Sequence, residues 1–270
     1  MSEGIPKEEG LSGRERRNGL FLKQVFKELL AKAGYRLERT GGKYPVTRPI
    51  DTNGVEILAD PEFQKSCRMI DGLSLLDTPR LANLWMLARL TDPSGAMAEI
   101  GTYRGGGALH LSNCCPDRPM VVCDPFAKES FQGLDPRLDK NFHLGQFSDH
   151  GEEPVRCLFK GRKAMIVRGY FPQSVAAVTL PMISFVHLDV DVYAAIKESL
   201  DYLLAPGRLC ANSLIVLDDY NRLAEGVNKV VDEILARHAG TMVFPLFPGQ
   251  ALVVPATWRQ GAGAASKNAA

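Results

Sequence analysis

Apolar residues show two different kinds of spacing along the chain. In the N-terminal third they recur at helical spacing over residues 20–30, again from Pro61, and once more after the sequence D-T-P (77–79). For the third of these predicted helices, Thr78 is the expected N-cap and Pro79 suits the first helical position. The pattern predicts a helical N-terminal region.

From Ala96 onward, short apolar runs alternate with helical segments. Because these runs are apolar almost throughout, both faces of the sheet that they form are expected to be covered. This alternation predicts an α/β fold, a doubly wound and mainly parallel sheet. The predicted strands are residues 97–100, 120–123, 164–167, 183–188, 214–217, 242–246 and 251–254. The predicted helices between them are residues 106–113, 192–204 and 225–238.

We therefore divide the chain into four parts. Residues 1–18 and the tail 259–270 lack a hydrophobic pattern and are expected to be disordered. Residues 19–94 are expected to form a helical cap region, in which the Gly-, Pro- and Thr-rich stretch 41–53 is predicted to be loop. Residues 95–258 are expected to form the doubly wound domain.

The overall charge narrows the range of partners. A formal net charge of +1 indicates no basic face, so neither nucleic acid nor an anionic membrane is the expected partner. The apolar runs are too short to span a bilayer, and the polar N-terminus does not resemble a signal peptide. Six cysteines without a C-x-x-C motif fit a reducing cytoplasm. Whether the chain forms a homo-oligomer stays open.

The sequence E-I-G-T-Y-R-G-G-G (99–107) follows the first predicted strand and opens a helix. Glycine permits a sharp turn there, and the free N–H groups at the helix start suit a carboxylate or phosphate. A dinucleotide fingerprint needs a second glycine where this chain has Tyr103. S-adenosylmethionine has no pyrophosphate, and its amino-acid end needs only backbone groups and an acidic partner such as Glu99. We favour S-adenosylmethionine, with a purely structural turn as the alternative.

Asp124 ends the second strand, in the sequence V-V-C-D-P-F. A carboxylate at this position can bind both hydroxyls of a ribose, or it can simply cap the turn that follows. After the third strand, either Tyr170 or Phe171 stacks on an adenine or both pack in the core. The glycine turn and Asp124 together indicate a nucleoside-binding domain.

Four aspartates follow the fourth and fifth strands. Asp189 and Asp191 belong to H-L-D-V-D-V-Y, and Asp218 and Asp219 belong to L-D-D-Y. Since the carboxyl ends of parallel strands share one edge of a sheet, these carboxylates are expected to converge and to repel each other. A hard divalent cation such as Mg²⁺ would neutralise them; the alternative is that they cap helices and pair with basic residues. His187, inside the strand, is expected to face the core.

These motifs resemble the TylF-type (macrocin) O-methyltransferase family. The resemblance spans roughly residues 60 to 240 and includes G-V-N-K-V-V-D-E-I-L (226–235) beside the motifs above. It implies a Rossmann-like class I methyltransferase fold with an N-terminal helical cap, and S-adenosylmethionine and Mg²⁺ as cofactors. It also implies a small hydroxylated acceptor, a sugar or another secondary metabolite.

By motif, the resemblance implies that Asp189, Asp218 and Asp219 bind the metal. Asp191, the second aspartate of L-D-x-D, becomes the candidate general base. The residues implied to hold the cofactor are Glu99, Gly101, Thr102, Tyr103, Arg104 and Asp124, and we add Tyr170 for the adenine.

Two departures from the family pattern stand out. The stretch L-A-P-G-R-L-C-A-N-S (204–213) is slightly longer than the family's P-G-G turn and is expected to lengthen a loop without moving the aspartates. The first 60 residues do not match, so the acceptor is not identified. The other readings are a nicotinamide-dependent oxidoreductase, a hydroxylase-like relative on the same fold and a non-enzymatic nucleoside-binding protein. Tyr103 and the acidic cluster count against the oxidoreductase.

Overall fold

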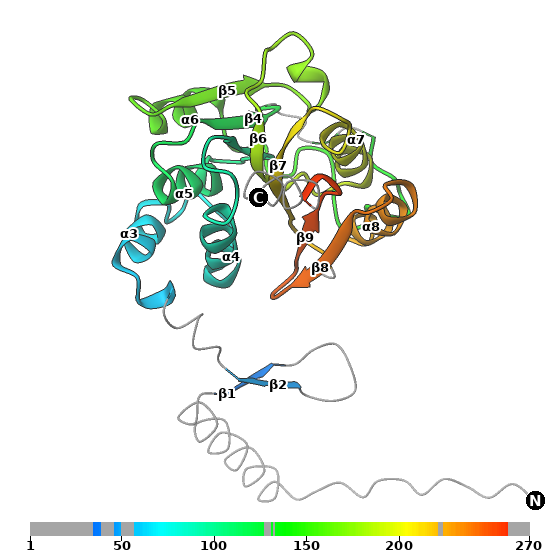
Figure 1. Cartoon of the computed structure of the whole chain (residues 1–270), viewed down its shortest axis with the longest axis horizontal. Helices are drawn as coiled ribbons and strands as arrows, with labels where there is room; N and C mark the ends of the chain where they lie inside the picture. The colour runs from blue at the N-terminus through cyan, green and yellow to red at the C-terminus, as the bar shows by residue number, and fades with distance from the viewer. Residues whose placement is uncertain are drawn as a thin grey trace, which may run out of the picture. The chain divides into compact units, whose positions relative to one another are not determined.

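The computed structural model describes residues 57–126, 131, 133–220 and 224–258, together with the backbone of residues 35–38 and 46–49. Contacts divide the chain into two units, Met1–Ala59 and Asp60–Ala270 (Figure 1). The helix predicted over residues 20–30 and both predicted disordered ends lie outside the described residues. The predicted domain boundaries stay predictions.

The first unit contains an antiparallel pair of strands, β1 (Tyr35–Glu38) and β2 (Val46–Pro49). β2 lies inside the stretch 41–53, so the prediction of a loop there is wrong for these residues. The β-branched Val46 and Thr47 favour a strand despite the glycines and prolines around them.

The second unit is built on one sheet. Its strands are β3 (Ala96–Ile100), β4 (Met120–Asp124), β5 (Ala164–Arg168), β6 (Ile183–Leu188), β7 (Leu209–Leu217), β8 (Met242–Leu246) and β9 (Gln250–Val254). The strand order is β5-β4-β3-β6-β7-β9-β8, with β3 to β7 parallel and β8 and β9 antiparallel at one edge. This topology confirms the predicted doubly wound, mainly parallel sheet.

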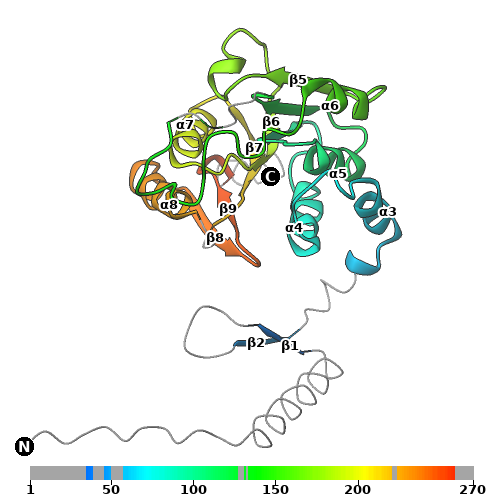
Figure 2. The same ribbon diagram turned by 180° about the vertical axis from the view of Figure 1, so that it is seen from behind.

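Helices cover both faces of the sheet, as the two opposite views show (Figures 1 and 2). One face carries α3 (Pro61–Met69), α4 (Thr78–Ala88), α5 (Gly106–Cys114) and α6 (Glu152–Leu158). The other carries α7 (Tyr193–Leu203) and α8 (Glu225–Arg237). The sequence pattern did not predict α6, which is too short to show a helical period. None of the described helices is both long and apolar enough to cross a membrane.

Helix α4 begins differently from the prediction. The side chain of Asp77 accepts from the backbone N–H of Arg80 at 3.1 Å, and Thr78 is already the first helical residue. Asp77, not Thr78, is therefore the N-cap. Both residue types serve as caps, and the proline after Thr78 fits the second helical position as well as the first.

Each face of the sheet has its own core. Ile100, Leu188 and Leu217 point to the side of α7 and α8, in the largest cluster of buried apolar residues. On the opposite side, next to α5, Glu99 lies beside His187 in the register of β3 and β6. Both are buried. A polar pair thus interrupts an otherwise apolar layer.

Strand β7 starts earlier than the sequence pattern predicted. Ile183 of β6 pairs with Leu209, whereas Phe185 pairs with Leu214, so β7 carries extra residues in an irregularity between these pairs. Of the segment that was expected to lengthen a loop, residues 209–213 extend this strand instead, and only residues 204–208 form the turn before it. Beyond it the register is regular up to the pair of Leu188 with Leu217, and the aspartates follow directly.

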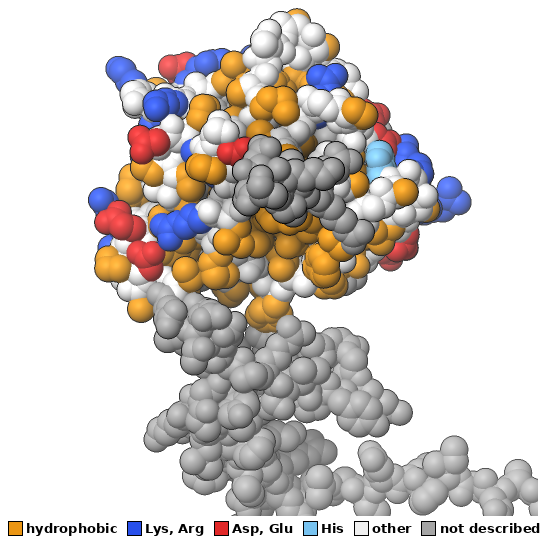
Figure 3. Space-filling view, viewed as in Figure 1, with side chains coloured by type: hydrophobic (Ala, Val, Ile, Leu, Met, Phe, Trp, Pro, Cys, Tyr) orange, Lys and Arg blue, Asp and Glu red, His pale blue; other side chains and the backbone are white. Residues whose placement is uncertain are grey.

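Charged side chains are mixed on the face that Figure 3 shows, where Lys and Arg lie among Asp and Glu around the rim and apolar side chains lie between them. This distribution agrees with a net charge near zero. The cysteines of the described segments are all free thiols.

Candidate active site

The carboxyl ends of the central strands open on a cavity of about 640 Å³. All but one of the predicted site residues line it: Glu99, Gly101, Thr102, Tyr103, Asp124, Tyr170, Asp189, Asp191, Asp218 and Asp219. The exception is Arg104. Its guanidinium pairs with Asp149 and donates to the carbonyl of Gly72 at 3.2 Å, outside the cavity wall.

Gly101 makes the turn after β3 possible. It has φ +83°, and a Cβ on it would lie 1.8 Å from the backbone oxygen of Asp189. Only glycine fits here. The close approach that the sequence suggested for a ligand is therefore an approach to the protein's own backbone, at the end of β6. It brings the glycine turn directly against the acidic cluster.

Glu99 is fixed by three contacts. Its carboxylate accepts from the Thr102 hydroxyl and from the Ala108 N–H at 2.7 Å, and Oε1 lies 2.8 Å from His187 Nδ1. Burial acts to lower the pKa of His187, but Glu99 and nearby aspartates raise it to about 9. Sequence reasoning placed His187 in the core and missed this pairing. The signal was its position opposite Glu99 once the two strands are neighbours.

Asp124 organises two turns. Oδ2 accepts from the N–H groups of Thr102 and Tyr103 at 2.9 and 3.1 Å. Oδ1 accepts from Phe126 N–H at 2.8 Å and lies 3.0 Å from His150 Nε2. Asp124 does cap the turn that follows it. These contacts use most of the acceptor capacity of a carboxylate, so a ribose hydroxyl bound here would have to compete with His150 for Oδ1.

Aromatic side chains form part of the cavity wall. The ring centroid of Tyr103 lies 5.2 Å from that of His150 and 5.9 Å from that of Phe147. After β5, Tyr170 and Phe171 both line the cavity, and the largely buried Phe171 also packs against the ring of Tyr202. Sequence reasoning missed His150 and Phe147, because their segment has no regular hydrophobic period.

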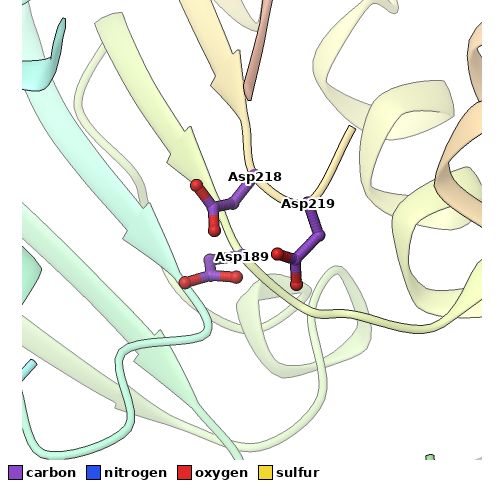
Figure 4. A group of neighbouring side chains, drawn as sticks. All are labelled: Asp189, Asp218 and Asp219. Carbon is purple, nitrogen blue, oxygen red and sulfur yellow. The ribbon is translucent and has the colours of Figure 1, made fainter. Parts of the chain in front are cut away.

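Three aspartates converge at the ends of β6 and β7. Asp189, Asp218 and Asp219 each offer a carboxylate oxygen within 4.8 Å of the others, and the three side chains face one another (Figure 4). Burial and repulsion from Asp218 and Asp191 raise the pKa of Asp189 well above its usual range. Burial and Asp219 do the same to the pKa of Asp191.

The backbone at this edge is strained. Asp191 has φ +61° and Asp219 has φ +57°, in the left-handed region that side chains other than glycine seldom adopt. Such residues cost about 1–3 kcal/mol each and cluster at functional sites.

Two residues that the sequence did not single out contact Asp218. Arg80 of α4 forms an ion pair with Oδ2, and Gln250 of β9 donates to Oδ1 at 2.8 Å. The alternative reading of the aspartates as salt-bridge partners therefore holds in part. One guanidinium does not balance four neighbouring carboxylates, however. A hard divalent cation with oxygen ligands fits the remaining charge and the donor set.

Comparison with solved structures defines the class of fold. The O-methyltransferase NovP aligns with a TM-score of 0.57 and 18% identity, over 68% of this chain and 82% of that one. The calicheamicin methyltransferase CalS11 aligns with a TM-score of 0.53 and 18% identity, over 94% and 98%. The SAH-bound Podospora anserina methyltransferase PaMTH1 aligns at 0.50 and 12%, over 78% and 98%. The fold is thus the Rossmann-like fold of methyltransferases, as the resemblance implied.

The family model for macrocin-O-methyltransferase (TylF) matches residues 72–246. This chain belongs to that family, which confirms the resemblance found in its sequence. It is a methyltransferase, and S-adenosylmethionine is the methyl donor expected of it. A comparison with curated proteins finds no match. The matched range includes the glycine turn, both pairs of aspartates and Arg80.

Proposed function

We propose that this protein is an S-adenosylmethionine- and divalent-metal-dependent O-methyltransferase that methylates a hydroxyl of a small molecule, a sugar or another secondary metabolite. The observation that carries the proposal is the meeting of two sites in one cavity. Glu99 and the glycine turn line one part of it, and the acidic cluster of Asp189, Asp218 and Asp219 lines another. The family's acceptors support the substrate class.

The cofactor's amino-acid end belongs beside β3. Glu99 lines the cavity with a fixed carboxylate and suits the ammonium group, and the turn around Gly101 supplies backbone donors. Tyr170 offers a ring surface for the adenine. Asp124 holds the turn in place and shares its Oδ1 between His150 and the ribose.

The acidic cluster supplies the chemistry at the acceptor. Asp189, Asp218 and Asp219 would hold Mg²⁺, which when bound lowers the pKa of an acceptor hydroxyl. Asp191 then takes the hydroxyl proton, a role that its raised pKa favours. The acceptor oxygen bonds to the methyl carbon as the bond from that carbon to the sulfonium breaks, leaving S-adenosylhomocysteine. Much of the acceleration comes from holding the two reactants in line.

The test is methyl transfer from labelled S-adenosylmethionine to a panel of hydroxylated small molecules, with and without a chelator. We expect chelation to abolish transfer while calorimetry still detects binding of S-adenosylhomocysteine. Full activity in the chelator would refute the metal's role. Cofactor binding without methylation of any acceptor would favour a non-enzymatic nucleoside-binding protein.

Two variants separate the roles of neighbouring aspartates. Asp189→Asn should lose metal affinity, whereas Asp191→Asn should keep it and lose turnover. The exposed Asp232 on α8 provides the control, since Asp232→Asn makes the same chemical change away from the cavity. If Asp191→Asn lost the metal and Asp189→Asn kept it, the two roles would have to be exchanged.

A further inference from the structure

Two sets of contacts connect helix α4 to Asp218. One is a direct ion pair, and the other is a chain of hydrogen bonds through neutral groups. Arg80 pairs directly with Oδ2 of Asp218, and its Nη1 lies 3.8 Å from Oδ1 of Asp219. In the second set of contacts, Asn83 donates to Gln250 Oε1 at 2.9 Å, and Gln250 Nε2 donates to Oδ1 of Asp218 at 2.8 Å. Both oxygens of this candidate metal ligand are therefore held by donors outside the acidic cluster.

The guanidinium of Arg80 is enclosed at this position. Its side chain is only 10% exposed and forms part of the cavity wall. Nη2 donates to the Leu75 carbonyl at 3.1 Å, and Nε lies 3.5 Å from Oδ1 of Asp77. The cap residue of α4 and the turn before it thus hold the cation against the cluster. Arg80 is a fixed charge here and not a surface side chain that happens to lie nearby.

The charges at this edge of the sheet can be counted. With a divalent cation bound, the four carboxylates would be ionised and would carry four negative charges, against one positive charge on Arg80 and two on the cation. The fixed cation and the metal would then share the same carboxylates. A second positive group close to the metal must also repel it, because like charges in a partly enclosed site interact strongly.

We propose that Arg80 is a built-in counter-ion of the acidic cluster, which competes with the divalent cation for Asp218 and Asp219 and keeps metal binding weak and reversible. Gln250 has the opposite effect, because a neutral donor orients a ligand without repelling the metal. This inference rests on the proposed metal site. It assigns Arg80 as a positioning residue whose charge tunes the affinity of that site.

Calorimetric titration of the full chain with Mn²⁺, without acceptor, tests the assignment. Arg80→Met should bind Mn²⁺ about tenfold more tightly, because a repelling charge is lost. Arg80→Lys keeps the charge and should stay near the wild-type affinity. Gln250→Leu should bind about tenfold more weakly, because Asp218 loses its neutral orienting donor. Arg89→Met is the matched control: it removes the same charge from the end of the same helix, at a 43% exposed site, and should change nothing.

Thermal unfolding gives a second readout that does not depend on turnover. Added Mn²⁺ should raise the Tm of Arg80→Met more than that of the wild type, since the unscreened carboxylates gain more from the metal. If Arg80→Met does not fold, Arg80→Gln, which also lacks the charge, carries the same two expectations.

Measurable Mn²⁺ binding by the wild type, with unchanged or weaker binding by the uncharged Arg80 variants, would overturn the counter-ion role and leave Arg80 as a structural link. Absence of Mn²⁺ binding from the wild type, Arg89→Met and the Arg80 variants alike would instead overturn the proposed metal site. The two failures are therefore distinguishable.

Discussion

Adding one methyl group to Gly107 of α5 should test whether the position of the Glu99 carboxylate matters for stability and cofactor binding. A Cβ on Gly107 would lie 2.1 Å from Glu99 Oε1 and 3.1 Å from Cδ, although real Cβ contacts essentially never fall below 3.0 Å. Oε1 is also the atom that lies 2.8 Å from His187 Nδ1. Gly107→Ala must therefore push the carboxylate away from its histidine partner and from the place where it faces the cavity.

The magnitude follows from two opposing effects. A hydrogen bond to a charged group contributes about 1.5–3 kcal/mol, and this is what the displaced carboxylate loses. Alanine is more favourable than glycine within a helix by about 1 kcal/mol, which offsets part of the loss. We expect a net loss of about 0.5–2 kcal/mol in the free energy of unfolding. The affinity for S-adenosylhomocysteine should fall about tenfold, which corresponds to about 1.4 kcal/mol.

Urea unfolding and calorimetric binding of S-adenosylhomocysteine measure the two effects separately. Gly151→Ala serves as the control, because a Cβ there meets only Cδ of Pro154, at 3.7 Å. It should leave the affinity for S-adenosylhomocysteine near its wild-type value, although some stability is lost because Gly151 is the N-cap of α6 and alanine caps a helix poorly. Wild-type cofactor affinity in a folded Gly107→Ala variant would refute the reasoning, since it would mean that the position of Glu99 does not matter to the cofactor.

Three further outcomes concern His110, Arg118 and Asp124. Burial lowers the pKa of His110 from 6.5 to about 4, so only the unfolded chain takes up its proton between these values. Stability should fall by about 3 kcal/mol as pH drops through this window, and denaturation of His110→Gln should show a correspondingly flatter pH dependence. Arg118, whose buried guanidinium donates to four groups, should cost at least about 3 kcal/mol on change to Met, measured in urea. Arg137→Met, at a side chain 91% exposed, should stay within about 0.5 kcal/mol. Asp124→Asn should weaken cofactor binding in calorimetry, because the single amide oxygen cannot replace both carboxylate oxygens and the NH2 group then faces the N–H of either the glycine turn or Phe126; an unchanged affinity would contradict this.

Much of the fold was predictable because its central strands are buried on both faces. The apolar runs at residues 120–123 and 183–188 coincide with β4 and β6, which are buried throughout and end where polar residues begin. The short helix α6 and the strand β2 were missed because neither gives a period long enough to read. The early start of β7 was missed for a different reason. Residues 209–213 mix apolar and polar types without strict alternation.

The sequence predicted where the main site residues lie, but not the residues that pair with them. Because parallel strands end at one edge, the glycine turn and the aspartates could be placed together from their positions alone. The partners that hold them come from far along the chain. Arg80 and Gln250 meet at Asp218 only because the first turn of α4 lies against the carboxyl end of β7, where β9 begins. No local pattern encodes such a meeting, and Arg104, which is local, turns away from the cavity.

The irregularity in β7 also determines where the chain can tolerate insertions and deletions. The extra residues lie between the pairs Ile183–Leu209 and Phe185–Leu214, before the strand regains a regular register. A change in chain length at the start of the strand is therefore absorbed before it reaches Asp218. Insertions and deletions around residues 205–212 should be tolerated far better than at the other end. The carboxyl edge of the sheet, where the aspartates lie, is thus structurally separated from changes in chain length at the opposite edge.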